Sequence, residues 1–307
     1  MISSITPVSA KSTIADWIDS RSLYVGKTTE MRQPRHATPL RLSAALPAEA
    51  PRLSAELPAE ALARDEALLD EVAVQRRVRV RWYTPSAPAV VLGLGLRHRR
   101  AAVVDDARCR AAGVAVLERR AGGGAVLLEP GLVCAAVCLP LPDARAPDDM
   151  TASYRWLGER FAAALGRLGV EHAQRVEVEQ ARADVHGLRA RAAAAEPVAR
   201  LLLDACYGAL SPHEVLVAPP GARPRKLVGL AQVRRRQAAL FQVGLLRRDQ
   251  SALADLLAVP DESVRAALRA ALGDRTTGLE ALLPAPLDLD RIAQVLQAAF
   301  DDALESA

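Results

Sequence analysis

One lysine stands among apolar residues in the segment "RPRKLVGLAQ", residues 223–232. The chain has 40 Lys and Arg residues together, yet after Lys27 every positive side chain except Lys226 is arginine. Arginine presents a planar fork that stays protonated, whereas lysine is a compact point charge that can lose its proton when buried. We therefore interpret Lys226 as a position where arginine does not serve, at the edge of a buried region. The alternative is a lysine retained by chance on a surface turn.

A glycine-rich segment, "ERRAGGGAVL", covers residues 118–127. Glycines that follow a strand let the backbone approach a ligand, and their N–H groups can face an anion. Arg119 and Arg120 come just before them and can pair with phosphate or carboxylate. No helix is expected after the glycines, and the Lys-Ser/Thr of a phosphate-binding P-loop is missing. Taken alone, a glycine-rich segment of this kind is more often only a hairpin turn.

The four cysteines are Cys109, Cys134, Cys138 and Cys206, and no two of them form a CxxC pair. Cys134 and Cys138 lie in the apolar run "VCAAVCLP", so we interpret them as small buried hydrophobic residues. The five histidines are scattered, and no metal site is predicted from local spacing. Cys206 is a candidate nucleophile toward a thioester or an acyl-adenylate. A buried and inert Cys206 is the alternative.

Composition excludes several classes of protein. The 307 residues are 50% hydrophobic with a formal net charge of +4, and arginines and acidic residues are interspersed along the chain. A dedicated nucleic-acid-binding protein gathers its basic residues on one face, so the short run Arg234–Arg236 is interpreted as a solvated loop or strand end. The N-terminus has no apolar signal sequence, and no apolar stretch is long enough to span a bilayer. We expect no membrane partner and a cytoplasmic location.

Hydrophobic periodicity predicts helices at residues 63–73, 101–112 and 154–168, and strands at 78–84, 88–95 and 114–120. Two further strands follow the glycines, and residues 213–233 read as a hairpin whose turn contains proline and glycine. Another strand covers 238–246, and helices follow residue 250. The Arg/Ala-rich stretch 180–197 is expected to be irregular or disordered.

These elements predict an α+β fold, with a mixed, largely antiparallel sheet flanked by helices and a small helical C-terminal segment. Residues 1–38 are Ser/Thr-rich and are expected to form a disordered tail. Residues 39–250 are expected to form the main domain, with 251–307 packed on it. A tandem near-duplicate, residues 41–62, has only two copies and is too short for a solenoid.

The two chemical segments together resemble the lipoate–protein ligase and octanoyltransferase family, whose catalytic domain is shared with biotin–protein ligases. Lys226 opens a "K-hydrophobic-x-G-x-x-Q" strand, and "TTGLEALL", residues 276–283, resembles the Thr/Ser-Leu segment near the end of many members. The resemblance covers roughly residues 60–300. The other matching positions are those of the RRxxGG-type hairpin and of the lysine strand: Arg119, Arg120, Gly122, Gly123, Gly124, Ala125, Val126, Gly229 and Gln232.

The resemblance implies transfer of lipoate or octanoate, as an adenylate or a thioester, onto one lysine of a lipoyl carrier domain. Such carriers belong to 2-oxoacid dehydrogenases or are the glycine cleavage H protein. Lys226 would hold the acyl carbonyl and the phosphate, with the hairpin residues, Gly229 and Gln232 binding substrate. A ligase would need ATP and Mg²⁺, whereas a thioester-dependent transferase would need neither.

Three features separate the branches of this family. "ACYGALSPHEVLV" resembles the segment of an octanoyltransferase branch that uses a cysteine–lysine pair, with Cys206 on its cysteine and Tyr207 in place of phenylalanine. Leu128 stands where many members have histidine, which leaves open a catalytically inactive acyl-binding or interaction protein. The paired arginines and triple glycine suit an adenylate phosphate. We therefore expect a lipoate–protein ligase-like activity, with the octanoyltransferase as the alternative.

Overall fold

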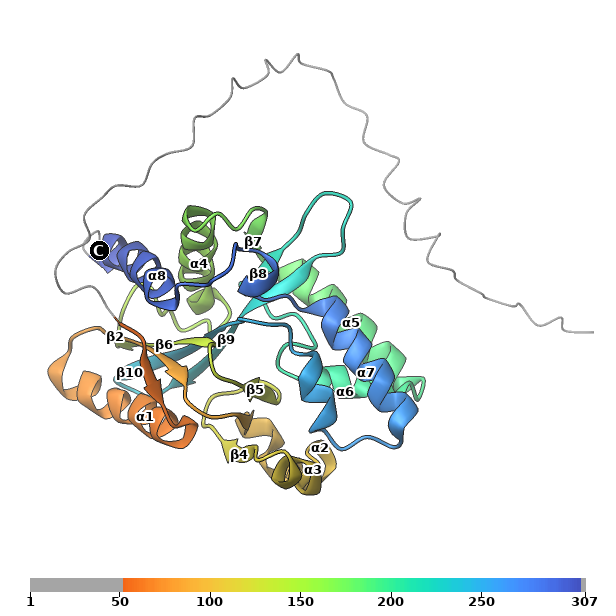
Figure 1. Cartoon of the computed structure of the whole chain (residues 1–307). Helices are drawn as coiled ribbons and strands as arrows, with labels where there is room; N and C mark the ends of the chain where they lie inside the picture. Colours follow the sequence, from red (N-terminus) through yellow and green to blue (C-terminus); the bar gives the residue numbers. More distant parts are fainter. Residues whose placement is uncertain (1–51, 305–307) are drawn as a thin grey trace, which may run out of the picture. The chain divides into compact units, whose positions relative to one another are not determined.

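The computed structural model describes residues 52–304, so the predicted tail at 1–38 and the first copy of the near-duplicate lie outside it. The second copy forms strand β1 (Ser54–Glu56) and the start of helix α1 (Pro58–Gln75). Two sheets make the centre of the described part, and helices surround them (Figure 1).

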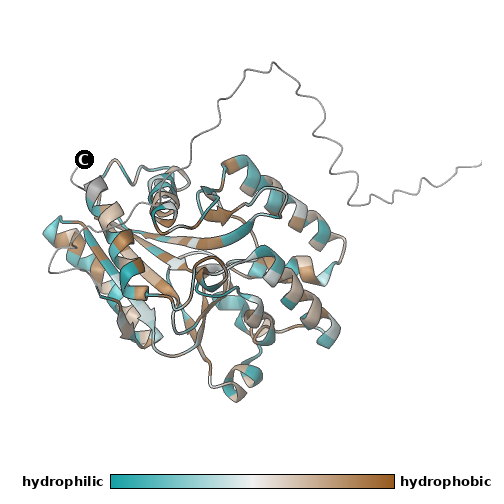
Figure 2. Cartoon of the chain, turned by 45° about the horizontal axis from the view of Figure 1, so that its top comes forward, coloured by the Kyte–Doolittle hydropathy of each residue, from teal (hydrophilic) through white to brown (hydrophobic). Residues whose placement is uncertain are grey.

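The larger sheet has seven strands in the order β1-β2-β6-β10-β9-β8-β7. Its neighbours pair antiparallel except β1 with β2, which confirms the predicted mixed, largely antiparallel sheet. Its strands are largely apolar (Figure 2). Their bounds are β2 (Arg79–Pro85), β6 (Val133–Pro140), β7 (Ala173–Arg175), β8 (Val215–Val217), β9 (Arg225–Arg234) and β10 (Ala238–Leu245).

The smaller sheet has the order β4-β3-β5 and contains the strands that flank the glycine segment. Strand β3 (Ala89–Leu92) lies in the centre, parallel to β4 (Ala115–Glu118) and antiparallel to β5 (Val126–Leu128). All four residues of β3 are buried, as expected for a short apolar strand covered on both faces. The glycine segment is therefore the connection from β4 to β5.

Helices cover both faces of the larger sheet. Helix α1 packs Leu69 and Val72 against the β6 and β10 residues Ala136, Cys138 and Leu240. Helices α4 (Arg155–Arg167) and α8 (Leu289–Leu304) pack together on the opposite face, where ring contacts join Trp82, Phe161 and Phe300.

The remaining helical elements lie beside the smaller sheet, at the right and bottom of Figure 1. They bury a second hydrophobic cluster that includes Val90, Leu202 and Leu268. Their bounds are η3 (Leu94–Arg99), α2 (Arg100–Val103), α3 (Asp106–Ala111), α5 (Val178–Ala193), α6 (Pro197–Asp204), η5 (Ser251–Asp255) and α7 (Glu262–Arg275); the short turns η4 (Ala152–Tyr154) and η6 (Leu279–Ala281) lie elsewhere.

The expectation of irregular structure at 180–197 is wrong, because residues 178–193 form helix α5. Alanine and arginine are both strong helix formers, and helix propensity is sufficient where few residues need to be buried. Ala181 and Leu188 are the buried residues of this helix. The predicted hairpin of β8 and β9 is confirmed as an antiparallel pair. No helix in residues 52–304 is both long and apolar enough to cross a membrane.

Two glycines of helix α4 provide a matched test of this packing. A Cβ atom at Gly158 would lie 2.0 Å from the carbonyl oxygen of His213, whereas a Cβ at Gly166 would meet nothing within 4 Å. We expect Gly158→Ala to lower the free energy of unfolding by about 1–3 kcal/mol. Gly166→Ala should raise it by about 0.5–1 kcal/mol, because alanine favours the helix. Urea unfolding of both variants measures the difference, and equal effects would contradict the described contact of α4 with His213.

Candidate active site

An apolar cleft opens between the larger sheet and strand β5, and Cys206 lies on its wall. Cys206 is partly exposed, whereas Cys109, Cys134 and Cys138 are buried. The apolar side chains that line the cleft come from five strands, α1 and the loop before β6: Leu62, Val91, Val126, Leu128, Leu132, Cys134, Leu230, Ala231 and Val243. A cleft of this composition suits a hydrocarbon chain whose reactive end lies near the thiol.

The glycine segment and the Cys206 segment, about eighty residues apart in sequence, are joined by backbone hydrogen bonds. The Ala125 N–H donates to the Asp204 carbonyl at 2.7 Å, and the Cys206 N–H donates to the Ala125 carbonyl at 2.8 Å. A Cβ atom at Gly124 would lie 2.4 Å from that Asp204 oxygen, so only glycine permits this approach. Gly124 and Ala125 therefore hold the cysteine in place.

Arg119 is the arginine that faces the cleft. Its Nη2 donates to the Gly122 carbonyl at 3.0 Å and lies 3.7 Å from the Cys206 sulfur. Its Nε is buried with no hydrogen-bond partner among the described residues. Gly123 has φ +97°, a left-handed conformation that favours glycine, and it turns the chain beside the thiol. A guanidinium at this position can pair with negative charge on sulfur or on a substrate oxygen.

Arg120, predicted together with Arg119, points elsewhere. Its Nε lies 3.1 Å from Glu66 of α1, and 59% of its side chain is exposed. It does not line the cleft. Both residues follow the end of β4, and the chain bends at Arg120, so sequence adjacency alone did not separate the two arginines.

Lys226 is completely buried, and its ammonium has three partners. Nζ donates to Glu214 Oε1 at 2.6 Å, to the Cys206 carbonyl at 2.7 Å and to the Ala209 carbonyl at 3.2 Å. The sequence predicted Lys226 at the edge of a buried region, whereas the structure places it inside that region. Lys226 does not line the cleft. Its role toward substrate remains a prediction; its observed contacts hold the segment that carries Cys206.

Glu214, the partner of Lys226, was not predicted from the sequence. The carboxylate is 1% exposed and accepts backbone N–H bonds from Ser211 at 2.7 Å and Leu230 at 3.4 Å. Burial raises the pKa of Glu214, while the charge of Lys226 and these hydrogen bonds lower it. A single acidic residue in "SPHEVLV" resembles any surface carboxylate, so the sequence contains no signal that distinguishes it.

Tyr207 lies across β9 and β10 at the point where both strands have glycine. A Cβ at Gly229 would lie 2.8 Å from the Tyr207 ring, and one at Gly244 would lie 2.6 Å from its hydroxyl. The hydroxyl donates to the Gly244 carbonyl at 2.5 Å and accepts from the Gly229 N–H at 3.2 Å. Gly229 thus makes room for the residue next to Cys206 and also borders the cleft.

The remaining predicted positions divide between the cleft and the interior. Leu128 lines the cleft where the family often has histidine. Gln232 does not line it; its Oε1 accepts from Ser153 at 3.2 Å, and substrate binding by Gln232 remains a prediction.

Burial raises the pKa of the Cys134 thiol and raises that of Cys138 to about 12, in keeping with their expected role as buried residues. Residues 52–304 contain no cluster of His, Cys, Asp and Glu suited to a metal ion.

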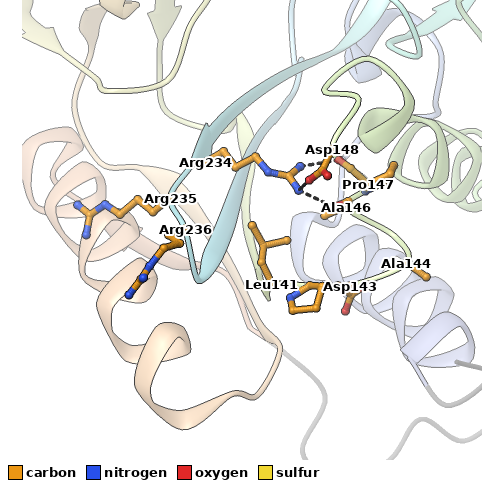
Figure 3. Close-up of a pocket in the computed structure, with 10 residues that line it drawn as sticks. Leu141, Asp143, Ala144, Ala146, Pro147, Asp148, Arg234, Arg235 and Arg236 are labelled. Carbon is orange, nitrogen blue, oxygen red and sulfur yellow. Dashed lines mark hydrogen bonds and ion pairs between the residues drawn. The ribbon is translucent and has the colours of Figure 1, made fainter.

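The arginine run at residues 234–236 borders a separate surface pocket (Figure 3). Arg234 donates to the carbonyl groups of Ala146 and Pro147 at 2.8 and 2.6 Å and lies 3.3 Å from Asp148. Arg235 pairs with Asp70 at 2.5 Å. Two of the three charges are therefore matched within the protein, which disfavours a nucleic-acid surface here.

Comparison with protein families identifies this architecture. Residues 57–301 match the model of the lipoyl protein ligase A/B catalytic domain. The chain belongs to this family. Two relatives are octanoyltransferases LipM: that of Kyrpidia tusciae is 32% identical over 69% of this chain and 71% of its own, and that of Exiguobacterium sibiricum is 27% identical over 80% and 82%.

Solved structures of the family share the fold. A bi-partite lipoate protein ligase from Thermoplasma acidophilum superposes with a TM-score of 0.62 at 20% identity, covering 83% of this chain and 85% of its own. A lipoate-protein ligase A bound with ATP gives 0.56 at 20% identity over the same shares. The predicted family and fold class are thus confirmed.

Loss of the Lys226 ammonium tests the buried pair. Lys226→Met leaves the Glu214 carboxylate buried without its partner, which should lower the free energy of unfolding by about 3–5 kcal/mol. The double variant Lys226→Met/Glu214→Gln removes both charges and should recover part of the loss. Urea unfolding of the two variants measures this, and a double variant no more stable than Lys226→Met would contradict the coupling.

The same pair predicts a pH dependence. Burial already raises the pKa of Glu214 above its ordinary 4.5, and the loss of Lys226 raises it further. Between the pKa of Glu214 in the unfolded chain and its higher pKa in the folded variant, the folded variant binds more protons than the unfolded chain. The free energy of unfolding of the variant therefore falls as pH rises through this range. The deficit of Lys226→Met relative to wild type should be smaller at about pH 5 than at about pH 8. A deficit that grows on acidification would contradict the assignment.

Proposed function

We propose that this protein transfers an octanoyl or lipoyl group to a lysine of a lipoyl carrier domain through a thioester on Cys206. The observation that supports this most directly is a partly exposed thiol at an apolar cleft, next to a guanidinium. The two LipM relatives are named octanoyltransferases, which favours the thioester route over the ligase expected from sequence.

The reaction would proceed in two transfers. The Cys206 thiolate attacks the carbonyl carbon of an octanoyl thioester on an acyl carrier, which is the donor. The new C–S bond forms, the old one breaks, and the thiolate of the acyl carrier leaves and takes up a proton. The neutral amine of the target lysine then attacks the acyl-cysteine. An amide bond forms, the Cys206 sulfur leaves, and the proton lost by the amine restores the thiol.

The surrounding residues have separate tasks in this proposal. The apolar cleft binds the acyl chain, and Arg119 stabilises negative charge on sulfur or on the carbonyl oxygen as it develops. Lys226 acts through the backbone, since its bonds to the Cys206 and Ala209 carbonyls fix the position of the nucleophile. Direct contact of Lys226 with substrate would require it to leave one of its present partners.

A second candidate is an ATP-dependent lipoate ligase, favoured by the structural neighbour that binds ATP. In that reaction ATP with Mg²⁺ would supply the adenylate, and the Gly122–Gly124 segment with Arg119 would hold its phosphate. Cys206 would then be dispensable. The carrier would be the same in both cases: a lipoyl domain of a 2-oxoacid dehydrogenase or the glycine cleavage H protein. A cytoplasmic location likewise remains a prediction, which cell fractionation would test.

Substitution of Cys206 distinguishes the two routes. With an octanoyl carrier thioester and no ATP, wild type should gain one octanoyl group that hydroxylamine removes, and Cys206→Ser should gain no hydroxylamine-sensitive group. Cys109→Ser is the control, because Cys109 is buried away from the cleft. Intact-mass spectrometry measures the adduct. ATP-dependent lipoylation that survives in Cys206→Ser would establish the ligase instead, and no modification under either condition would indicate an inactive acyl-binding protein.

The two adjacent arginines provide a second test. Arg119→Ala should slow acylation of Cys206 on the order of a hundredfold, as expected when one electrostatic donor is removed. Arg120→Ala should have a much smaller effect, because that side chain is paired with Glu66 outside the cleft. Single-turnover rates of octanoyl transfer measure both. Equal losses would show that Arg120 also reaches the substrate, as sequence analysis expected.

A further inference from the structure

The side of the cleft away from Lys226 is polar. On one face of the larger sheet, Gly229 pairs with Gly244, and Ala231 pairs with Gln242 in the next row. Along β9 this order leads away from Lys226, which holds the Cys206 segment. Gln242 and Tyr83 both line the cleft. An acyl chain that extends from Cys206 along this face would bring its distal end toward Gln242, one row beyond the row that contains Gly244 and Tyr83.

Gln242 is 9% exposed and one of its two polar atoms lacks a partner. Its Nε2 donates to Asp65 Oδ2 at 2.9 Å, whereas its Oε1 has no hydrogen-bond partner among the described residues. Turning the amide round would place Oε1 against a carboxylate oxygen, so the carboxylate sets the orientation. A buried acceptor without a donor is unfavourable, and a bound group that supplies a donor would relieve this.

The neighbours of Gln242 already have their own partners. Asp65 is completely buried and accepts from Arg81 and, at 3.0 Å, from the Tyr83 hydroxyl. Arg81 also pairs with Glu56 and lies 4.2 Å from the centre of the Tyr83 ring. Burial raises the pKa of Tyr83, so its hydroxyl remains a donor to Asp65. Arg81 balances the negative charge of Asp65, so the Gln242 oxygen is the acceptor that lacks a partner. Without a net negative charge nearby, an uncharged donor is favoured over a cation.

We propose that Gln242, held by Asp65 and Tyr83, is a specificity-determining residue that accepts a hydrogen bond from the distal end of the acyl chain. The preferred chain would be of medium length with a terminal hydroxyl or thiol. A saturated chain ending in a methyl group would enter the same cleft but leave the Gln242 oxygen unpaired. This inference rests on the proposed function for its reaction, but the binding preference does not depend on the nucleophile.

Competition between two acyl donors tests the inference. Wild type and Gln242→Leu are each given an equal mixture of the octanoyl and ω-hydroxyoctanoyl thioesters of the acyl carrier, and intact mass reports the ratio of the two adducts on Cys206. Gln242→Leu should shift the ratio toward octanoyl by about tenfold, as expected for one buried hydrogen bond. Gln297→Leu is the matched control: it removes a glutamine that bonds Trp82 Nε1 outside the cleft, and it should leave the ratio unchanged.

An equal ratio in wild type and Gln242→Leu would overturn the inference. If Gln242→Leu does not fold, Tyr83→Phe provides the second variant, because it loosens the support of Asp65 and should shift the ratio in the same direction. If neither donor forms an adduct, the proposed function fails, and binding alone decides the inference. The rise in melting temperature with octanoic acid is then compared with that for ω-hydroxyoctanoic acid, and a wild-type advantage for the hydroxy acid that Gln242→Leu loses would support it.

Discussion

The ion pair of Lys226 with Glu214 is the interaction on which the geometry of the candidate site depends. Both groups lie inside the protein, where an unpaired charge would be strongly unfavourable. The other two hydrogen bonds of the Lys226 ammonium go to the carbonyl groups of Cys206 and Ala209, so one ammonium holds the segment that carries the candidate nucleophile Cys206. A guanidinium is too broad for this enclosed position, which explains a lone lysine in an arginine-rich chain.

Close backbone contacts complete the arrangement. Gly124 lets the β4–β5 connection pair with the Cys206 segment, and Gly229 with Gly244 makes room for the Tyr207 ring on the sheet. The glycines that look like a phosphate loop in sequence therefore also serve a packing purpose. This purpose is compatible with anion binding at Gly122, where a side chain would meet nothing within 4 Å.

The cleft combines two environments that impose different demands on a ligand. Its walls are apolar and favour a hydrocarbon chain without distinguishing one methylene group from the next. The amide oxygen of Gln242 would discriminate more strongly, because a buried acceptor that is left unpaired has a high free-energy cost. Chain binding and end-group selection can thus reside in separate residues of one cleft.

Sequence by itself determined the family, the α+β class and most element positions, and it named Cys206, Arg119 and Lys226 as candidate site residues, because periodicity and residue type are local properties. It failed at 180–197, where an Arg/Ala-rich stretch without a clear apolar face is nevertheless the helix α5. Only the tertiary structure separated Arg119 from Arg120 and revealed Glu214, Gln242 and Asp65. The reason is physical: burial and pairing of a polar side chain depend on strands distant in sequence, and a lone Glu or Gln reads the same on a surface as in a core.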